Sequence, residues 1–226
     1  MNTPRWLALA TLALGLVASV PAQAPAVFTR PGVIVVNEII GSVQTVKEGS
    51  SAAAVKDQTL RAEVAFKTGR RSSATLEFSN GSTLQIGVES EVAVDEYWQL
   101  PHSQSGKMAD WKEEPSASRA TLRLVRGDLS GTIKTLKVAR GSSFTVDLAA
   151  GTLRIVEGDF SARVEMTPLG LGICVVEMGR GRGEFEPVGG KLTPLAVGKR
   201  LAFAVEQDAR TGTMKVVPAP EPDAKK

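Results

Sequence analysis

Alternation of apolar and polar residues along short segments constrains this chain more than any other feature of its sequence. Residues 75–78 (TLEF) alternate, and residues 82–86 (STLQI) alternate again after Asn80-Gly81. An Asn-Gly pair between two alternating runs is a strong hairpin signal, because both residues tolerate positive φ. The two-residue period predicts an all-β fold of many short strands. It returns downstream in segments 144–148, 153–155, 160–164 and 201–205.

Glycines stand between most of the predicted strands and mark the expected turns. They are Gly127, Gly131, Gly141, Gly151 and Gly158. Turn signals that recur about every 8–12 residues are typical of all-β domains. Only residues 49–66 offer evidence for a helix, in their Ala-rich start. A polar loop followed by a strand over residues 59–64 explains the same segment equally well, so both structures remain open.

The first 22 residues have the organisation of a secretory signal peptide. Arg5 precedes an apolar stretch over residues 6–20, which is shorter than the roughly 20 residues that a membrane-spanning helix needs. Pro25 would block cleavage after Ala24, so we expect cleavage after Ala22. The alternative is an uncleaved amino-terminal anchor. Cleavage predicts a soluble periplasmic or secreted protein with no remaining transmembrane segment.

Segments that break the strand pattern set the expected domain organisation. A flexible leader over residues 23–32 precedes one β domain over residues 33–207. A carboxy-terminal extension over residues 208–226 ends in a Pro-rich, disordered tail from residue 217. Within the domain, residues 97–118 form a long, polar loop insertion. Long loops in compact domains are usually functional or disordered.

The composition argues against several classes of chemistry. One Cys and one His exclude an intramolecular disulfide, a thiolate zinc cage and a multi-histidine metal site. The net charge of +3 is mild and the charges are mixed, so no basic stripe for a phosphate backbone appears. Cys174 lies in an apolar run (ICVV) and is expected to be a buried strand residue. We therefore expect no metal, no cofactor and no nucleic-acid partner.

Residues 65–87 (AFKTGRRSSATLEFSNGSTLQIG) have an ordered set of turns and strands. A Thr-Gly turn leads through small residues into an alternating strand, an Asn-Gly-Ser turn and a second strand. Residues 122–136 (LRLVRGDLSGTIKTL) and 141–146 (GSSFTV) continue the order. This arrangement resembles the FecR domain. One part departs from the family pattern, because Val156-Glu157-Gly158-Asp159 stands where Arg-Gly-Thr is usual.

The resemblance implies both an architecture and a place in the cell envelope. FecR-like domains imply an elongated, solenoid-like β-roll or a sandwich-like wrap of short strands. The best-known members of the family are inner-membrane regulators of iron uptake, with a cytoplasmic anti-sigma segment, one transmembrane helix and a periplasmic β domain. This chain resembles the exported domain standing alone. An exported chain does not reach a cytoplasmic sigma factor, so the resemblance does not imply direct sigma-factor control.

The sequence does not indicate a catalytic centre. A Ser–His pair would have to use His102, which lies beside Pro101 in the predicted loop and is more typical of a solvated residue. The run GRGRG over residues 179–183 offers backbone amides, Arg180 and Arg182 to an anion, although a flexible turn explains it more simply. We therefore predict that the protein is not an enzyme.

Three aromatic residues in polar surroundings are candidates for partner binding. Tyr97, Trp98 and Trp111 would bind protein or sugar if their rings were exposed, and the simpler explanation is that they fasten the loop to the sheet. Our prediction is a FecR-like domain that acts by protein–protein interaction in envelope signalling or assembly, with an unknown envelope protein as partner. The alternative is a carbohydrate-binding module for cell-wall or surface polysaccharide. The possible partner-binding residues are Tyr97, Trp98, Trp111, Arg180 and Arg182.

Overall fold

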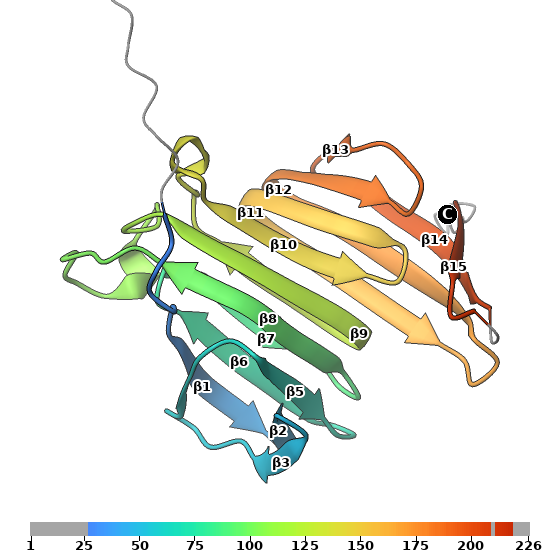
Figure 1. Cartoon of the computed structure of the whole chain (residues 1–226), viewed down its shortest axis with the longest axis horizontal. Helices are drawn as coiled ribbons and strands as arrows, with labels where there is room; N and C mark the ends of the chain where they lie inside the picture. The colour runs from blue at the N-terminus through green and yellow to red at the C-terminus, as the bar shows by residue number, and fades with distance from the viewer. Residues whose placement is uncertain (1–26, 209–210, 219–226) are drawn as a thin grey trace, which may run out of the picture.

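The computed structural model describes residues 27–208 and 211–218. Almost all of this part is β-structure, arranged as one open sheet (Figure 1), so the predicted all-β fold is confirmed. The predicted signal peptide (1–22) and the tail from residue 219 lie outside the described residues. Among residues 27–208 and 211–218, no helix is long and apolar enough to cross a membrane.

Fifteen strands and two short 3-10 helices follow one another along the described part of the chain. In order they are β1 (Ile34–Ile40), β2 (Val43–Lys47), β3 (Ser50–Ala53), β4 (Thr59–Leu60), β5 (Val64–Thr68), β6 (Ser73–Phe78), β7 (Thr83–Ile86), β8 (Glu91–Gln99), η1 (Met108–Asp110), β9 (Ser118–Ile133), η2 (Val138–Arg140), β10 (Ser143–Leu148), β11 (Gly151–Met166), β12 (Leu171–Pro187), β13 (Thr193–Leu195), β14 (Arg200–Gln207) and β15 (Met214–Pro218).

The strands pair in the order β15-β14-β12-β11-β10-β9-β7-β6-β1-β4, and a branch runs from β9 through β8, β5 and β2 to β3. All of these neighbours are antiparallel except β9 and β10, which run parallel. The predicted hairpin at Asn80-Gly81 is present, joining β6 to β7. In Figure 1 the amino-terminal strands gather at one end of the sheet and the carboxy-terminal strands at the other.

One apolar core runs along the sheet from β1 to β14. Its aromatic members follow one another in contact: the Phe78 and Phe144 ring centroids lie 6.0 Å apart, and those of Phe144 and Phe160 lie 6.4 Å apart. Strand β6 shows how the sequence builds this core, because Leu76 and Phe78 are fully buried while Glu77 between them is partly exposed. Alternate side chains of a strand point to opposite faces, so the two-residue period places every second residue in the core.

The structure corrects the expected turns at Gly127 and Gly158. Both residues lie inside 16-residue strands, β9 and β11, and not between short ones. They have positive φ (86° and 103°), as does Gly181 (87°) inside the 17-residue β12. Before the bend in β11 the odd-numbered residues face the core, as Ile155 does. After the bend the even-numbered residues face it, as Phe160 does. A β-bulge at this point keeps the apolar side of both halves on the core.

Gly131 also lies within β9, and Gly151 is the first residue of β11, directly after the turn that follows β10. Gly141 does mark a turn, before β10. Residues 49–66, for which helix and extended structure were both open, are extended and contain β3, β4 and the start of β5. Backbone pairing within the sheet satisfies their N–H and C=O groups, which outweighs the weak helical preference of the alanines.

Both predicted flexible ends are partly fixed to the sheet. In the leader, the Gly32 N–H donates to the Tyr97 carbonyl (2.9 Å) and the Gln99 N–H donates to the Arg30 carbonyl (3.1 Å). At the other end, Val217 and Pro218 belong to β15, which pairs with β14, so the ordered sheet continues beyond residue 207. Paired backbone at both ends explains the difference, because composition does not reveal which segments find a neighbouring strand.

Candidate functional site

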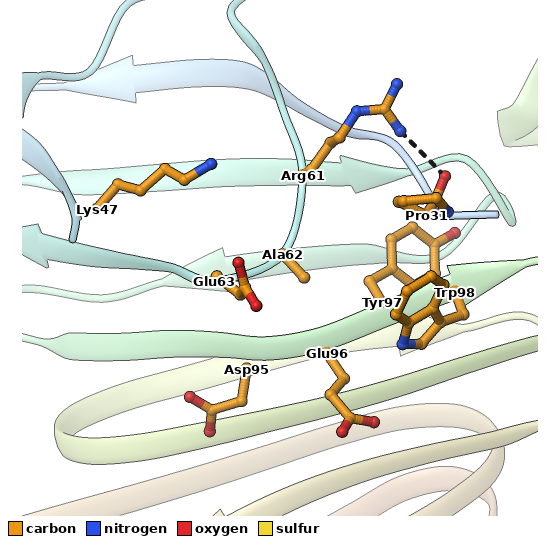
Figure 2. Close-up of a pocket in the computed structure, with 9 residues that line it drawn as sticks. All are labelled: Pro31, Lys47, Arg61, Ala62, Glu63, Asp95, Glu96, Tyr97 and Trp98. Atoms are coloured by element: carbon orange, nitrogen blue, oxygen red, sulfur yellow. Dashed lines mark hydrogen bonds between the residues drawn. The ribbon is translucent and has the colours of Figure 1, made fainter. Parts of the chain in front are cut away.

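Trp98 lines a surface hollow of about 340 Å³ beside β8, which we name the Trp98 hollow (Figure 2). Arg61 reaches across it and donates from Nη1 to the Pro31 carbonyl at 3.3 Å. Asp95 accepts a hydrogen bond from Arg123 Nη2 at 2.7 Å. The hollow therefore offers charges of both signs beside one partly exposed indole ring. Its lining residues are Pro31, Lys47, Arg61, Ala62, Glu63, Asp95, Glu96, Tyr97 and Trp98.

Tyr97 is a core residue, with only 1% of its surface exposed. Its ring packs edge-on against Phe78 with centroids 4.9 Å apart, and its hydroxyl accepts a hydrogen bond from the Asn80 N–H at 2.9 Å. The same hydroxyl lies 3.1 Å from Ser79 Oγ. Burial raises the pKa of the Tyr97 phenol. This side chain fastens the β6–β7 hairpin to β8 and presents no ring to a partner.

The predicted loop over residues 97–118 is shorter than expected and is held down at its base. Tyr97 and Trp98 belong to β8 and Ser118 belongs to β9, so the loop covers residues 100–117. Ser116 Oγ donates to the Leu100 carbonyl at 2.6 Å, which closes the base of the loop. The sequence places Tyr97 and Trp98 in the loop because the pairing of β8 with β9 joins residues far apart in the chain and is not visible in the local pattern.

Glu114 anchors this loop to the sheet through buried hydrogen bonds, although its side chain is an ionisable carboxyl group. It is fully buried, and its Oε1 accepts a hydrogen bond from the Lys137 N–H at 2.7 Å. Its Oε2 accepts a short hydrogen bond from Ser118 Oγ. Burial raises the pKa of Glu114, and the hydrogen bonds from Ser118, Ser142 and Lys137 partly oppose this shift. No sequence signal singled out Glu114, because its neighbours suggested a solvated charged loop.

Trp111 lies at the end of the 3-10 helix η1 and is partly exposed. Its ring meets the His102 ring edge-on, with centroids 5.8 Å apart. It also rests over Gly81, where an added Cβ would lie 3.1 Å from the indole. The Nε1 atom is buried with no hydrogen-bond partner in the described part of the protein. Trp111 therefore joins the loop to the β6–β7 turn and still leaves part of its ring on the surface.

Arg180 and Arg182 are paired with carboxylates across the bulge and do not form a flexible turn. Arg180 Nε lies 2.5 Å from Asp159 Oδ2, and Arg182 Nε lies 3.0 Å from Glu157 Oε1. A hydrogen bond from Thr135 is the main reason that the pKa of Glu157 is lowered, and Arg182 contributes further. Glu157 and Asp159 thus match the two arginines in charge, which disfavours an external anion at this place.

A second hollow, of about 340 Å³, brings Trp111 and Arg180 together, and we name it the Trp111 hollow. It meets a neighbouring hollow at Thr132, which lines both. Thr75, Thr83, Gln85 and Ser130 line that neighbour on the exposed face of β6, β7 and β9. Alternation within each strand predicted that these residues face outward, but only the strand order brings them side by side. The further residues of the Trp111 hollow are Lys112, Ile133, Lys134, Thr135, Glu157, Gly158 and Gly181.

His102 and Cys174 occupy very different surroundings. Partial burial lowers the pKa of the His102 imidazole, and the charge of Arg30 lowers it further. Cys174 is fully buried, and burial raises the pKa of its thiol to about 12, which favours the inert thiol form. Within residues 27–208 and 211–218, no cluster of three or more His, Cys, Asp or Glu side chains could hold a metal ion.

Comparison with known proteins gives few matches. No protein-family model matches the chain, and no curated protein matches it. Two crystal structures of a candidate anti-sigma factor from Parabacteroides distasonis are similar in fold, each with a TM-score of 0.43. Sequence identity is 8% and 9%, and each match covers 68% of this chain. The chain spans 59% of the length of those proteins, and a likeness at this level carries no conclusion about function.

Proposed function

We propose that this protein is an exported, FecR-like β domain without catalytic activity that acts by binding an envelope protein. The observation that carries the proposal is the open sheet, which ends in uncovered strand edges. An extended segment of a partner adds to such an edge through main-chain hydrogen bonds, and alternate side chains supply selectivity. The resemblance of residues 65–87 and 122–146 to the FecR domain supports an envelope role.

The strand order ends at β15 and β4 and its branch ends at β3, and these three strands differ in how well they admit a new strand. Strand β4 is only two residues long and offers little backbone to a partner. Strand β15 carries Lys215 and Pro218, and a charge or a proline at an edge discourages strand addition. Strand β3 has neither; its residues are Ser50, Ser51, Ala52 and Ala53, all exposed, and it pairs only with β2. We therefore assign β3 as the edge that receives the partner.

The geometry of β3 identifies the backbone groups that face outward. The Ala54 N–H donates to the Val43 carbonyl at 2.9 Å, so that pair is hydrogen-bonded within the sheet. Hydrogen bonds alternate along an antiparallel strand, so Thr45 and Ala52 form the next such pair. The N–H groups of Ser51 and Ala53 consequently point away from β2 and remain for a partner.

A pull-down from envelope extract tests this assignment. The variant Ala53→Pro removes one outward N–H without removing a hydrogen bond to β2, and Ala53→Ser is the matched control that keeps the N–H. We expect the wild-type protein and the control to retain the same envelope protein and Ala53→Pro to lose it. Retention by all three proteins would refute the role of β3. Retention of no envelope protein by the wild-type protein above the bare resin would refute the proposed function.

Carbohydrate binding is the second candidate function, and the Trp111 hollow favours it. The partly exposed indole stands at one end of a surface that continues through Thr132 to hydroxyl and amide side chains. Indole rings stack on apolar faces, while hydroxyl and amide groups both donate and accept hydrogen bonds, which suits a neutral polysaccharide. Tryptophan fluorescence measured across a glycan panel tests this function, with Trp98→Phe and Trp111→Phe to locate any change. Fluorescence that no glycan alters would exclude it.

A further inference from the structure

One end of the sheet carries an excess of positive charge. The leader (27–33), the 100–117 loop, the start of β9 and the connection from β9 to β10 (134–142) meet at this end (Figure 1). Hydrogen bonds join them: the Glu114 N–H donates to the Thr135 carbonyl at 3.1 Å, and the Ser118 N–H donates to Ser142 Oγ at 3.2 Å. We name this surface the basic end. Its basic residues are Arg30, Lys107, Lys112, Arg119, Lys134, Lys137 and Arg140.

The basic end is more positive than the chain as a whole. Seven basic residues against Asp110, Glu113 and Glu114 give it a net charge of +4, whereas the whole chain carries +3. Glu114 is buried, and Glu113 Oε2 lies 3.8 Å from Lys137 Nζ. Five of the basic side chains are exposed and make no ion pair with any carboxylate of the described residues; they are Arg30, Lys107, Lys112, Arg119 and Arg140. Acidic residues are interspersed with these along the sequence, so only the fold gathers the positive charges at one end.

Exposed apolar side chains accompany these charges. Val27 is 78% exposed, and Val138 in η2 is 52% exposed, two residues before Arg140. The Arg119 guanidinium lies 5.0 Å from the centre of the Phe28 ring, which joins the leader to β9. Basic residues beside exposed apolar ones are typical of surfaces that lie on anionic lipid. The charges meet the headgroup phosphates, and the apolar groups enter the layer beneath them.

The described chain also begins at this end, which places it close to the predicted signal peptide. Six residues (21–26) join the apolar segment of residues 6–20 to Val27, and they can span roughly 20 Å at most. A signal peptide enters the membrane during export, so the basic end would emerge within this distance of the lipid. The position of the leader and the charge of the surface therefore point to the same neighbour.

We propose that the basic end rests on an anionic phospholipid membrane after export, with its lysine and arginine side chains on the headgroup phosphates. This contact rests on the export that the proposed function includes. No residue of β3 belongs to the basic end, so the contact keeps the protein at the membrane surface and leaves β3 free for an envelope protein. Attraction of this kind acts without a fixed pocket and weakens as salt screens the charges.

Flotation with lipid vesicles tests this contact. The probe is a vesicle of phosphatidylcholine and phosphatidylglycerol, and vesicles of phosphatidylcholine alone are the neutral comparison. The protein is the chain from residue 23 onward, which contains every described residue and lacks the apolar segment. We expect it to float with the anionic vesicles at low salt, to be released as salt is added, and to remain unbound with the neutral vesicles.

Two double variants show whether the basic end makes the contact. Lys112→Glu with Arg140→Glu reverses two exposed charges of the basic end, and Lys191→Glu with Lys199→Glu reverses two exposed charges on either side of β13. Both pairs change the net charge equally. Each basic residue near an anionic surface strengthens binding about fivefold, so the first pair should weaken vesicle binding about 25-fold or more. The second pair should bind nearly as the wild type does.

Far-ultraviolet circular dichroism verifies that both double variants keep the β spectrum. A wild-type chain that floats with neither kind of vesicle, or equally with both, would overturn the proposal. Equal weakening by the two double variants would also overturn it, since overall charge and not the basic end would then govern binding. Binding to soluble polyphosphate without binding to the vesicles would assign the surface to an anionic polymer instead. The pull-down that tests β3 involves none of the substituted residues, so failure of the membrane contact and failure of the proposed function remain distinguishable.

Discussion

The bulge that crosses β11 and β12 makes Gly158 a position at which a single added methyl group should strongly destabilise the fold. A Cβ added there would lie 2.1 Å from the Arg180 carbonyl oxygen and 2.7 Å from the Gly181 Cα. Both neighbours are backbone atoms of a paired strand, so they cannot rotate away as a side chain would. The φ of 103° is also strained for any residue with a Cβ.

The size of the expected loss of stability follows by comparison with Gly189, which has a φ of 69° and nothing within 4 Å of its added Cβ. Gly189→Ala should therefore cost only the left-handed backbone, about 1 kcal/mol. Gly158→Ala strains the backbone more and also forces two paired strands apart. We therefore expect it to lower the free energy of unfolding by about 3 kcal/mol or more. With a urea dependence of about 2.5 kcal/mol/M, the midpoints should fall by about 0.4 M and about 1.2 M.

Urea unfolding followed by far-ultraviolet circular dichroism measures both midpoints under the same conditions. The pair of variants separates the backbone strain from the close approach of β12, because both substitutions are the same and only their surroundings differ. A midpoint for Gly158→Ala equal to or above that of Gly189→Ala would refute the reasoning. The glycine would then be needed for its conformation alone and not for its contact with β12.

Three further predictions concern buried polar groups. Tyr97→Phe should lower the free energy of unfolding by about 1–3 kcal/mol, because the buried Asn80 N–H loses its acceptor; an unchanged urea midpoint would contradict this. Glu114 has a raised pKa in the folded protein, so the wild type should gain stability as the pH falls through that pKa towards the ordinary value of glutamate. Glu114→Gln lacks this gain, and its stability relative to the wild type should be highest at pH 8; a pH-independent difference would exclude the mechanism. Cys174 should resist iodoacetamide at pH 8 in the native protein and react in urea, as mass spectrometry would show, because burial raises its pKa to about 12.

Local alternation was enough to predict the all-β fold, and in β6 and β7 it also separates buried from exposed positions. Leu76, Phe78, Leu84 and Ile86 occupy alternate positions in β6 and β7, and all four are buried. The hairpin between these strands followed from Asn80-Gly81, where Gly81 has a φ of 84°. Such features depend on residues close in sequence, so a single sequence contains them.

Candidate residues for binding could be identified by type but not by surroundings. Tyr97 and Trp98 are neighbours with similar sequence contexts, yet the Tyr97 side chain is buried in the core and Trp98 is partly exposed. Successive side chains of a strand point to opposite faces, so placing the boundary of β8 correctly would have separated them. Arg180 and Arg182 likewise looked free for an anion, because their carboxylate partners lie on β11, more than twenty residues away.

The sequence by itself determined that the chain forms short-period β-structure with apolar residues on one side of each strand. Only the tertiary structure decided that three of the strands are long and bent, with the bends of β11 and β12 aligned at Gly158 and Gly181. The same holds for the basic end, where the leader, the 100–117 loop and the connection from β9 to β10 meet. The physical reason is that alternation is a property of neighbouring residues, whereas strand order, bulges and hollows depend on hydrogen bonds and packing between segments far apart in the chain.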